Sequence, residues 1–239
     1  FTKSKYQDLI YFKNGNILIN YIKEELKIAL NSKFLFKNNN NNNNNKTKNL
    51  INIIYKKKQN KDALVNIDLS NTKSIINSKE FKKFVQFKNF SLQDQDIIFA
   101  SENLINFKLN KKNEIQNFSI KSKLKSESIL IDYKSQRIKK YFSDFKNQIK
   151  FSNSHLDLDY KNKKFKFNLK SKYSINDINE NVSLNVEKKD NKYFFDLDLD
   201  LDSAEIDIEE LDYRKKADIK SNLNINGIYK DNNEIIFKN

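Results

Sequence analysis

The sequence lacks cysteine, proline, methionine and tryptophan, and it has only one histidine and two glycines among its 239 residues. Without cysteine, neither a disulfide nor a thiolate metal site can form. Two isolated glycines, Gly15 and Gly227, cannot build a glycine-rich phosphate loop or the tight turn around a nucleophilic serine. The single histidine, His155, has no identifiable catalytic partner, so we predict an ordinary residue at a strand end. The sequence therefore predicts a protein that is not an enzyme and that uses no cofactor and no metal.

Long apolar runs are also missing. The longest have four residues, such as Leu9–Phe12 and Ile97–Ala100, whereas a membrane-spanning helix needs about 20. These residues therefore contain neither a membrane span nor a signal peptide. Because the sequence contains no methionine, it does not begin at a start codon, and we expect a fragment of a longer protein.

Arginine is scarce although the chain is strongly basic, with a formal net charge of +14. Only Arg137 and Arg214 are arginines, and arginine is the residue favoured for bidentate phosphate and base contacts. An excess of Lys, Asn, Ile, Phe and Tyr over Gly, Ala, Pro and Arg is typical of an A/T-rich genome. We therefore do not expect nucleic acid as a partner. A lysine-rich β protein that binds nucleic acid or another polyanion is kept as the alternative.

Residues 1–96 predict a mixed α/β portion. Asn14-Gly15 predicts a hairpin turn, and apolar residues at helical spacing predict a helix over 19–30. The eight consecutive asparagines at 38–45 predict an inserted loop. Alternation predicts a strand over 63–69, and Ser78 is the expected N-cap of a short helix over 78–87.

Residues 97–239 predict an antiparallel meander, because short alternating segments are separated by polar turns such as those at 111–113 and 161–163. Tyr141, Phe142 and Phe145 predict one helical turn within it. The fold class expected for the whole chain is mainly β, with one or two short helices in the N-terminal half.

The alternation is clearest at Tyr193–Asp202, where apolar side chains occupy one face of a strand and four aspartates the other. The aspartates, Asp196, Asp198, Asp200 and Asp202, form a line, whereas calcium requires oxygens that converge on one point. We expect a solvated face that pairs with lysines across the sheet. The apolar face has two interpretations from the residues alone, the core of a closed sandwich or the lining of an open trough.

The segment around Asn181–Asn239 resembles the AsmA-like superfamily, in particular its YhdP-like branch. A strand, a turn and a second strand recur there in this order, and the matching positions are Ala204, Ile206, Ile208, Leu211, Tyr213 and Lys215. This chain lacks the Pro and Gly that usually flank the lysine of the pattern.

The resemblance implies a meander that curls into an open groove, as in bridge-like carriers of phospholipids between the inner and outer membranes. It implies a periplasmic location in the cell envelope and an inner-membrane anchor outside this sequence. The expected groove lining is Phe195, Leu197, Leu199, Leu201, Ile206, Ile208, Leu223 and Ile225. A structural β-sandwich or adhesin module is the other alternative.

Overall fold

The computed structural model describes residues 10–36, 49–82, 90–133, 145–175, 178–208, 212–230 and 234–237. Its strands are β1 (Ile10–Ile22), β2 (Glu25–Phe36), β3 (Asn49–Lys58), β4 (Ala63–Asn77), β5 (Ser91–Leu92), β6 (Asp96–Leu109), β7 (Ile115–Asp132), β8 (Gln148–Lys161), β9 (Lys164–Ile175), β10 (Ile178–Lys189), β11 (Lys192–Asp200), β12 (Ile206–Ile208), β13 (Tyr213–Lys215), β14 (Asn222–Lys230) and β15 (Ile235–Phe237). One helical turn, α1 (Ser78–Phe81), lies between β4 and β5. Within these ranges, no helix is long and apolar enough to cross a membrane.

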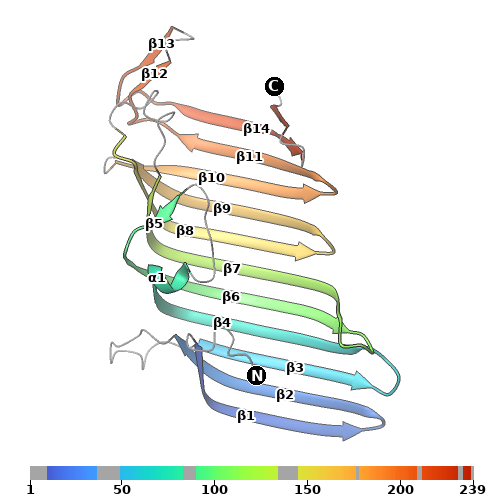
Figure 1. Ribbon diagram of the computed structural model, residues 1–239. Helices are drawn as coiled ribbons and strands as arrows, with labels where there is room; N and C mark the ends of the chain where they lie inside the picture. Colours follow the sequence, from blue (N-terminus) through green and yellow to red (C-terminus); the bar gives the residue numbers. More distant parts are fainter. Residues whose placement is uncertain are drawn as a thin grey trace. The chain divides into compact units, whose positions relative to one another are not determined.

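Thirteen of the strands form one antiparallel sheet, which is not closed. Its order is β1-β2-β3-β4-β6-β7-β8-β9-β10-β11-β14-β15, and β5 pairs with β7 beside this path (Figure 1). Almost every strand pairs with the next one along the sequence, as the short polar turns dictate. The prediction of a mainly β, open antiparallel meander is confirmed. The described residues form a single further sheet, the two-stranded hairpin β12–β13.

The chain divides into two compact units, each assembled from three segments. Unit 1 contains residues 1–76, 98–125 and 157–165, and unit 2 contains residues 77–97, 126–156 and 166–239. Both units use residues from before and after position 96. This partition therefore differs from the division into 1–96 and 97–239 expected from the sequence, which stays a prediction.

The first hairpin of unit 1 corrects two sequence predictions. Asn14-Gly15 is not its turn but lies inside β1, where the register with β2 shifts between Lys13 and Asn16. The turn is formed by Lys23 and Glu24, both with positive φ, as a two-residue hairpin loop requires. The helix predicted over 19–30 is wrong because these residues belong to β1, the turn and β2. The apolar residues of β2 also fit a period of two, and pairing with β1 and β3 satisfies the backbone.

The predicted helix over 78–87 begins where expected but has a different cap. Asn77 is the N-cap, and its side-chain oxygen accepts a hydrogen bond from the Lys79 amide at 3.0 Å. Ser78 is buried one position later, and its backbone N–H donates to the Gln95 carbonyl at 2.8 Å. Residues 83–87, the asparagine run at 38–45, and Tyr141 and Phe142 of the predicted helical turn lie outside the described residues.

Candidate functional site

The candidate site lies in unit 2, on one face of the three neighbouring strands β10, β11 and β14. Their register places three apolar side chains in each of two rows across the sheet, and Gly227 completes a third. We call this surface the apolar face, and its residues are Val182, Leu199 and Leu223 in the first row, Leu184, Leu197 and Ile225 in the second, and Val186, Phe195 and Gly227 in the third. Five of the eight predicted lining residues lie here: Phe195, Leu197, Leu199, Leu223 and Ile225.

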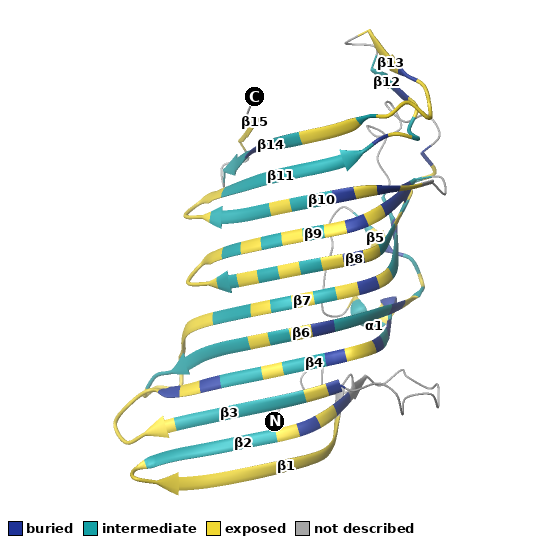
Figure 2. Ribbon diagram, turned by 180° about the vertical axis from the view of Figure 1, so that it is seen from behind, coloured by how far each residue is buried: buried dark blue, intermediate teal, exposed yellow. Residues whose placement is uncertain are grey.

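The apolar face is only partly shielded from solvent. Most of its side chains are half-buried, Leu223 is 40% exposed, and Val182 at one end is buried at 9%. Figure 2 shows buried residues on β10 toward the end that leads to β12, whereas β14 is exposed at that end and buried near its other end. Such exposure is what a single layer of sheet produces, since neighbouring side chains shield one another only at their flanks. A contiguous apolar surface of this kind is typical of a binding site.

The absence of a side chain at Gly227 leaves room for the aromatic ring of Phe195. A Cβ atom added at Gly227 would lie 2.5 Å from the Ile236 carbonyl oxygen and 2.8 Å from Cζ of Phe195. The ring therefore occupies the space that a side chain would take, an arrangement known as aromatic rescue of a strand glycine. The Phe195 ring also packs edge-on against Phe237 of β15, with 6.4 Å between centroids.

The opposite surface of the same strands, which we call the polar face, carries the aspartate row. Asn224 donates to Asp198 at 2.6 Å and to Asp196 at 3.3 Å, and Asn181 donates to Asp200 at 2.8 Å. Asparagine amides thus donate to Asp196, Asp198 and Asp200, and the Ser221 backbone N–H donates to Asp202 at 2.6 Å, whereas lysines were expected. The hydrogen bonds from Asn181 and Asn222 lower the pKa of the Asp200 carboxyl.

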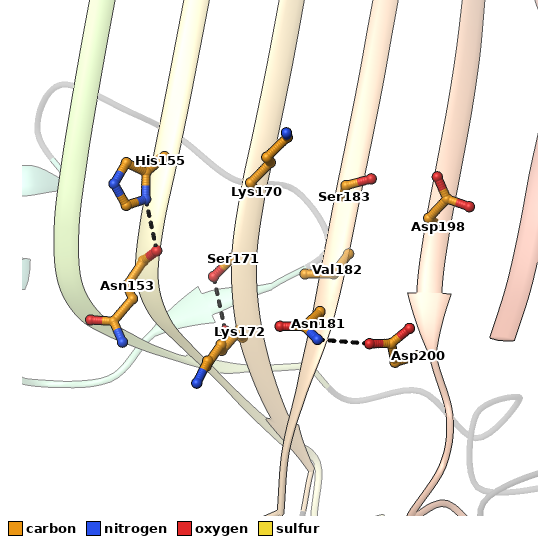
Figure 3. A pocket seen from close by; sticks show the side chains of 10 residues that line it. All are labelled: Asn153, His155, Lys170, Ser171, Lys172, Asn181, Val182, Ser183, Asp198 and Asp200. Carbon is orange, nitrogen blue, oxygen red and sulfur yellow. Dashed lines mark hydrogen bonds between the residues drawn. The ribbon is translucent and has the colours of Figure 1, made fainter. Parts of the chain in front are cut away.

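The polar face continues over β8 and β9 (Figure 3). Lys170, Lys172 and His155 lie there beside Asn181 and Asp198 around a shallow depression. His155 is exposed in the middle of β8 rather than at a strand end, and its Nδ1 lies 3.0 Å from the Asn153 carbonyl oxygen. No three acidic or histidine side chains within the described ranges are grouped closely enough to hold a metal ion.

A buried polar cluster closes the end of the sheet where the chain leaves β11, and the sequence analysis missed it. The Tyr173 hydroxyl donates to Glu180 at 2.7 Å and also to the Asp200 carbonyl. Glu180 in turn accepts from both the amide and the hydroxyl of Ser203 at 2.6 Å. Burial, followed by the hydrogen bond to Glu180, raises the pKa of Tyr173 far above its usual range. In the sequence, the only sign that the Tyr173 side chain is buried is the alternation of apolar and polar residues along β9.

The remaining predicted lining residues do not share the apolar face. Leu201 follows β11 and is buried at 5%. Ile206 and Ile208 alternate with Asp207 in β12, which pairs with β13 in the separate hairpin. Lys215 of β13 is buried at 4%, and its ammonium group donates to the carbonyls of Asp202, Ala204 and Lys216. Leu211 lies outside the described residues.

Unit 2 therefore presents a strip of sheet with chemically opposite surfaces. The apolar face can bind a ligand by removing apolar area from water, without any polar group that would fix its position along the strip. The polar face carries carboxylate and amide side chains that are hydrogen-bonded to one another. Comparisons with protein-family models, with curated proteins and with solved structures find no match for this chain.

Proposed function

We propose that this chain binds the acyl chains of phospholipids along its apolar face, as one segment of an AsmA/YhdP-like envelope protein. In this proposal the whole protein spans the periplasm, is anchored in the inner membrane outside this sequence, and carries phospholipids between the inner and outer membranes. The observation that carries the proposal is the partly exposed apolar face of β10, β11 and β14. The resemblance of the segment 181–239 supplies the identity of the ligand.

The energetics suit a carrier rather than a tight binding pocket. Burying apolar surface stabilises a complex by about 25 cal/mol per Å², or about 0.8 kcal/mol for each methylene group. Because the rows of the apolar face are chemically alike, an acyl chain that advances by one row exchanges one set of contacts for a similar set. Movement along the strip is then nearly neutral in free energy, and no catalytic group is needed.

One lysine at the end of the rows places a positive charge beside the apolar face. Lys188 lies opposite Tyr193, which pairs with Tyr229, and its ammonium group donates to the Tyr193 hydroxyl at 2.9 Å. A lysine near an anionic lipid surface contributes about 1 kcal/mol of attraction. Anionic phospholipids are therefore expected to bind somewhat better than zwitterionic ones with the same acyl chains.

A matched pair of substitutions on β10 tests the proposal. Leu184 lies on the apolar face, and its neighbour Ser183 lies on the polar face opposite Asp198. Leu184→Lys and Ser183→Lys add the same charge at adjacent positions, but only the first interrupts the apolar face. The purified proteins are incubated with phosphatidylglycerol vesicles, and native mass spectrometry counts the retained lipid, with circular dichroism as the check on folding.

We expect the unaltered chain and Ser183→Lys to retain phospholipid, and Leu184→Lys to lose most of it. The added lysine should attract an anionic lipid, so loss would arise from the broken apolar surface. Retention that high salt abolishes equally in all three proteins would instead indicate polyanion binding. A lipid-free unaltered chain would overturn the proposal for this segment.

A further inference from the structure

The hairpin β1–β2 recurs 139 positions later as β8–β9. Residues 12–34 read FKNGNILINYIKEELKIALNSKF, and residues 151–173 read FSNSHLDLDYKNKKFKFNLKSKY. Identical residues occupy seven aligned positions: Phe12 and Phe151, Asn14 and Asn153, Tyr21 and Tyr160, Lys27 and Lys166, Leu30 and Leu169, Ser32 and Ser171, and Lys33 and Lys172. At most of the other positions on the same face of these strands, both copies carry an apolar residue. We interpret the two hairpins as copies of one structural unit.

The backbone geometry of the two copies agrees in detail. Asn14 and Asn153 have φ values of 53° and 52° inside their strands, and the turn residues Lys23, Glu24, Asn162 and Lys163 all have positive φ. The hydroxyl of Ser32 donates to the carbonyls of Lys13 and Lys33 at 3.0 and 3.1 Å. The hydroxyl of Ser171 donates to the equivalent carbonyls of Ser152 and Lys172 at 3.1 and 2.8 Å. Each serine thus satisfies the carbonyl of the residue that precedes the asparagine.

The two copies differ at their outer edge. β8 is followed outward by β7, whose Phe118 ring lies 5.9 Å from the Tyr160 ring and whose Lys121 lies 3.7 Å from Asp159. Among the residues that the structure describes, β1 stands at the end of the sheet. Ile17, Ile19 and Tyr21 are 64%, 63% and 69% exposed, whereas their equivalents Leu156, Leu158 and Tyr160 are half-buried.

We infer that the outer edge of β1 binds an extended polypeptide segment of the β7 kind, which pairs antiparallel with β1 and places an aromatic side chain against Tyr21. A thirteen-residue edge strand with apolar side chains is a template for strand addition unless it is covered. The pairing of β7 with β8, the equivalent strand, specifies the chemistry of the segment that covers it. This inference concerns an edge of the sheet and does not depend on the lipid-binding proposal.

A peptide with the sequence of residues 115–132 is the probe, added to the whole chain. Binding should slow hydrogen exchange of the β1 amides about tenfold or more at saturation, because free edge amides become hydrogen-bonded. A second peptide with Phe118→Ser tests the aromatic contact and should bind more weakly. Amides of β10 and β11, on the proposed lipid-binding strip, should be unaffected.

Two double variants of β1 complete the test. Ile19→Lys with Tyr21→Lys places charges on the face that the peptide would cover and should abolish the protection. Leu18→Asp with Asn20→Asp alters the other face of β1 toward the aspartates found at the equivalent positions in β8, and it should leave the protection intact. Protection by the peptide that neither variant changes would overturn the inference. Concentration-dependent dimerisation without peptide, lost in the lysine variant, would also overturn it in favour of a second copy of the chain.

Discussion

The hairpins β1–β2 and β8–β9 show which properties of a strand pair are local and which come from its neighbours. Both have an asparagine with positive φ inside the first strand, a serine that donates to the carbonyl before that asparagine, and a two-residue turn with positive φ. Their outer strands nevertheless differ in exposure, since β8 has β7 beside it and β1 lies at the edge. Residues within about 20 positions therefore determine the shape of a hairpin, whereas burial is determined by its position in the sheet.

The aromatic pair should give the largest difference between the copies. Tyr160→Ala removes a half-buried ring that packs against Phe118, and we expect it to lower the free energy of unfolding by about 2 kcal/mol. Tyr21→Ala removes the equivalent ring at a site 69% exposed and should change stability by less than about 0.5 kcal/mol. Urea unfolding of both variants measures the difference. Equal effects would mean that the edge of β1 is already covered.

The serine contacts should have similar effects in the two copies. Ser32→Ala and Ser171→Ala each remove a hydroxyl that satisfies the carbonyl before the asparagine, and we expect losses of about 1 kcal/mol. Ser171→Ala should be slightly the worse, because Ser154 also lies within hydrogen-bonding distance of Ser171, at 2.8 Å. Replacement by threonine, which keeps the hydroxyl, is the control. A loss in one copy alone would show that the two contacts are not equivalent.

Changes at the two asparagines with positive φ should be smaller still. Asn14→Ala and Asn153→Ala place a less tolerant residue at a φ near +50°, which costs about 1 kcal/mol or less. Asn14→Gly and Asn153→Gly should be close to neutral, because glycine adopts this conformation without strain. Differential scanning calorimetry on the four variants tests this. A lower melting temperature with glycine than with alanine would contradict the conformational argument.

The smallest effect is expected at the turns, and it should be stabilising. Glu24 and Lys163 hold φ values of 62° and 67°, so Glu24→Gly and Lys163→Gly should each raise stability by about 0.5 kcal/mol. Lys27→Gly, inside β2, is the matched control and should lower the stability of the fold. Because the turn is common to both copies, a gain confined to one of them would contradict the equivalence.

Alternation predicted the strands from residue 97 onward because a period of two and short polar turns leave few other structures. The same rule failed near the N-terminus. Asn14 adopts the positive φ that suggested a turn, but it does so in a bulge, and the turn falls on Lys23-Glu24. Local sequence cannot distinguish these cases because both need the same backbone conformation.

The sequence predicted which side chains of a single strand share a face of the candidate site. It did not predict the contacts that require several strands to come together. Alternation placed Phe195, Leu197 and Leu199 on one face, and pairing with β10 and β14 brings them beside Leu184 and Ile225. The hydrogen bond between Tyr173 and Glu180 depends on where two strands end, which periodicity does not encode. Whether the face binds lipid stays a prediction.

The nearly consecutive strand order has a consequence for folding. In the described part of the sheet, the backbone of each strand pairs with its immediate neighbours, so stability is close to a sum of nearest-neighbour terms, as in repeat proteins. Such a sheet can unravel from an end while the remainder keeps its structure, and unfolding need not be a single all-or-none transition. By the same reasoning, duplicating a hairpin lengthens the sheet without disturbing the pairs already present. Two related hairpins in one sheet are the expected result of such a duplication.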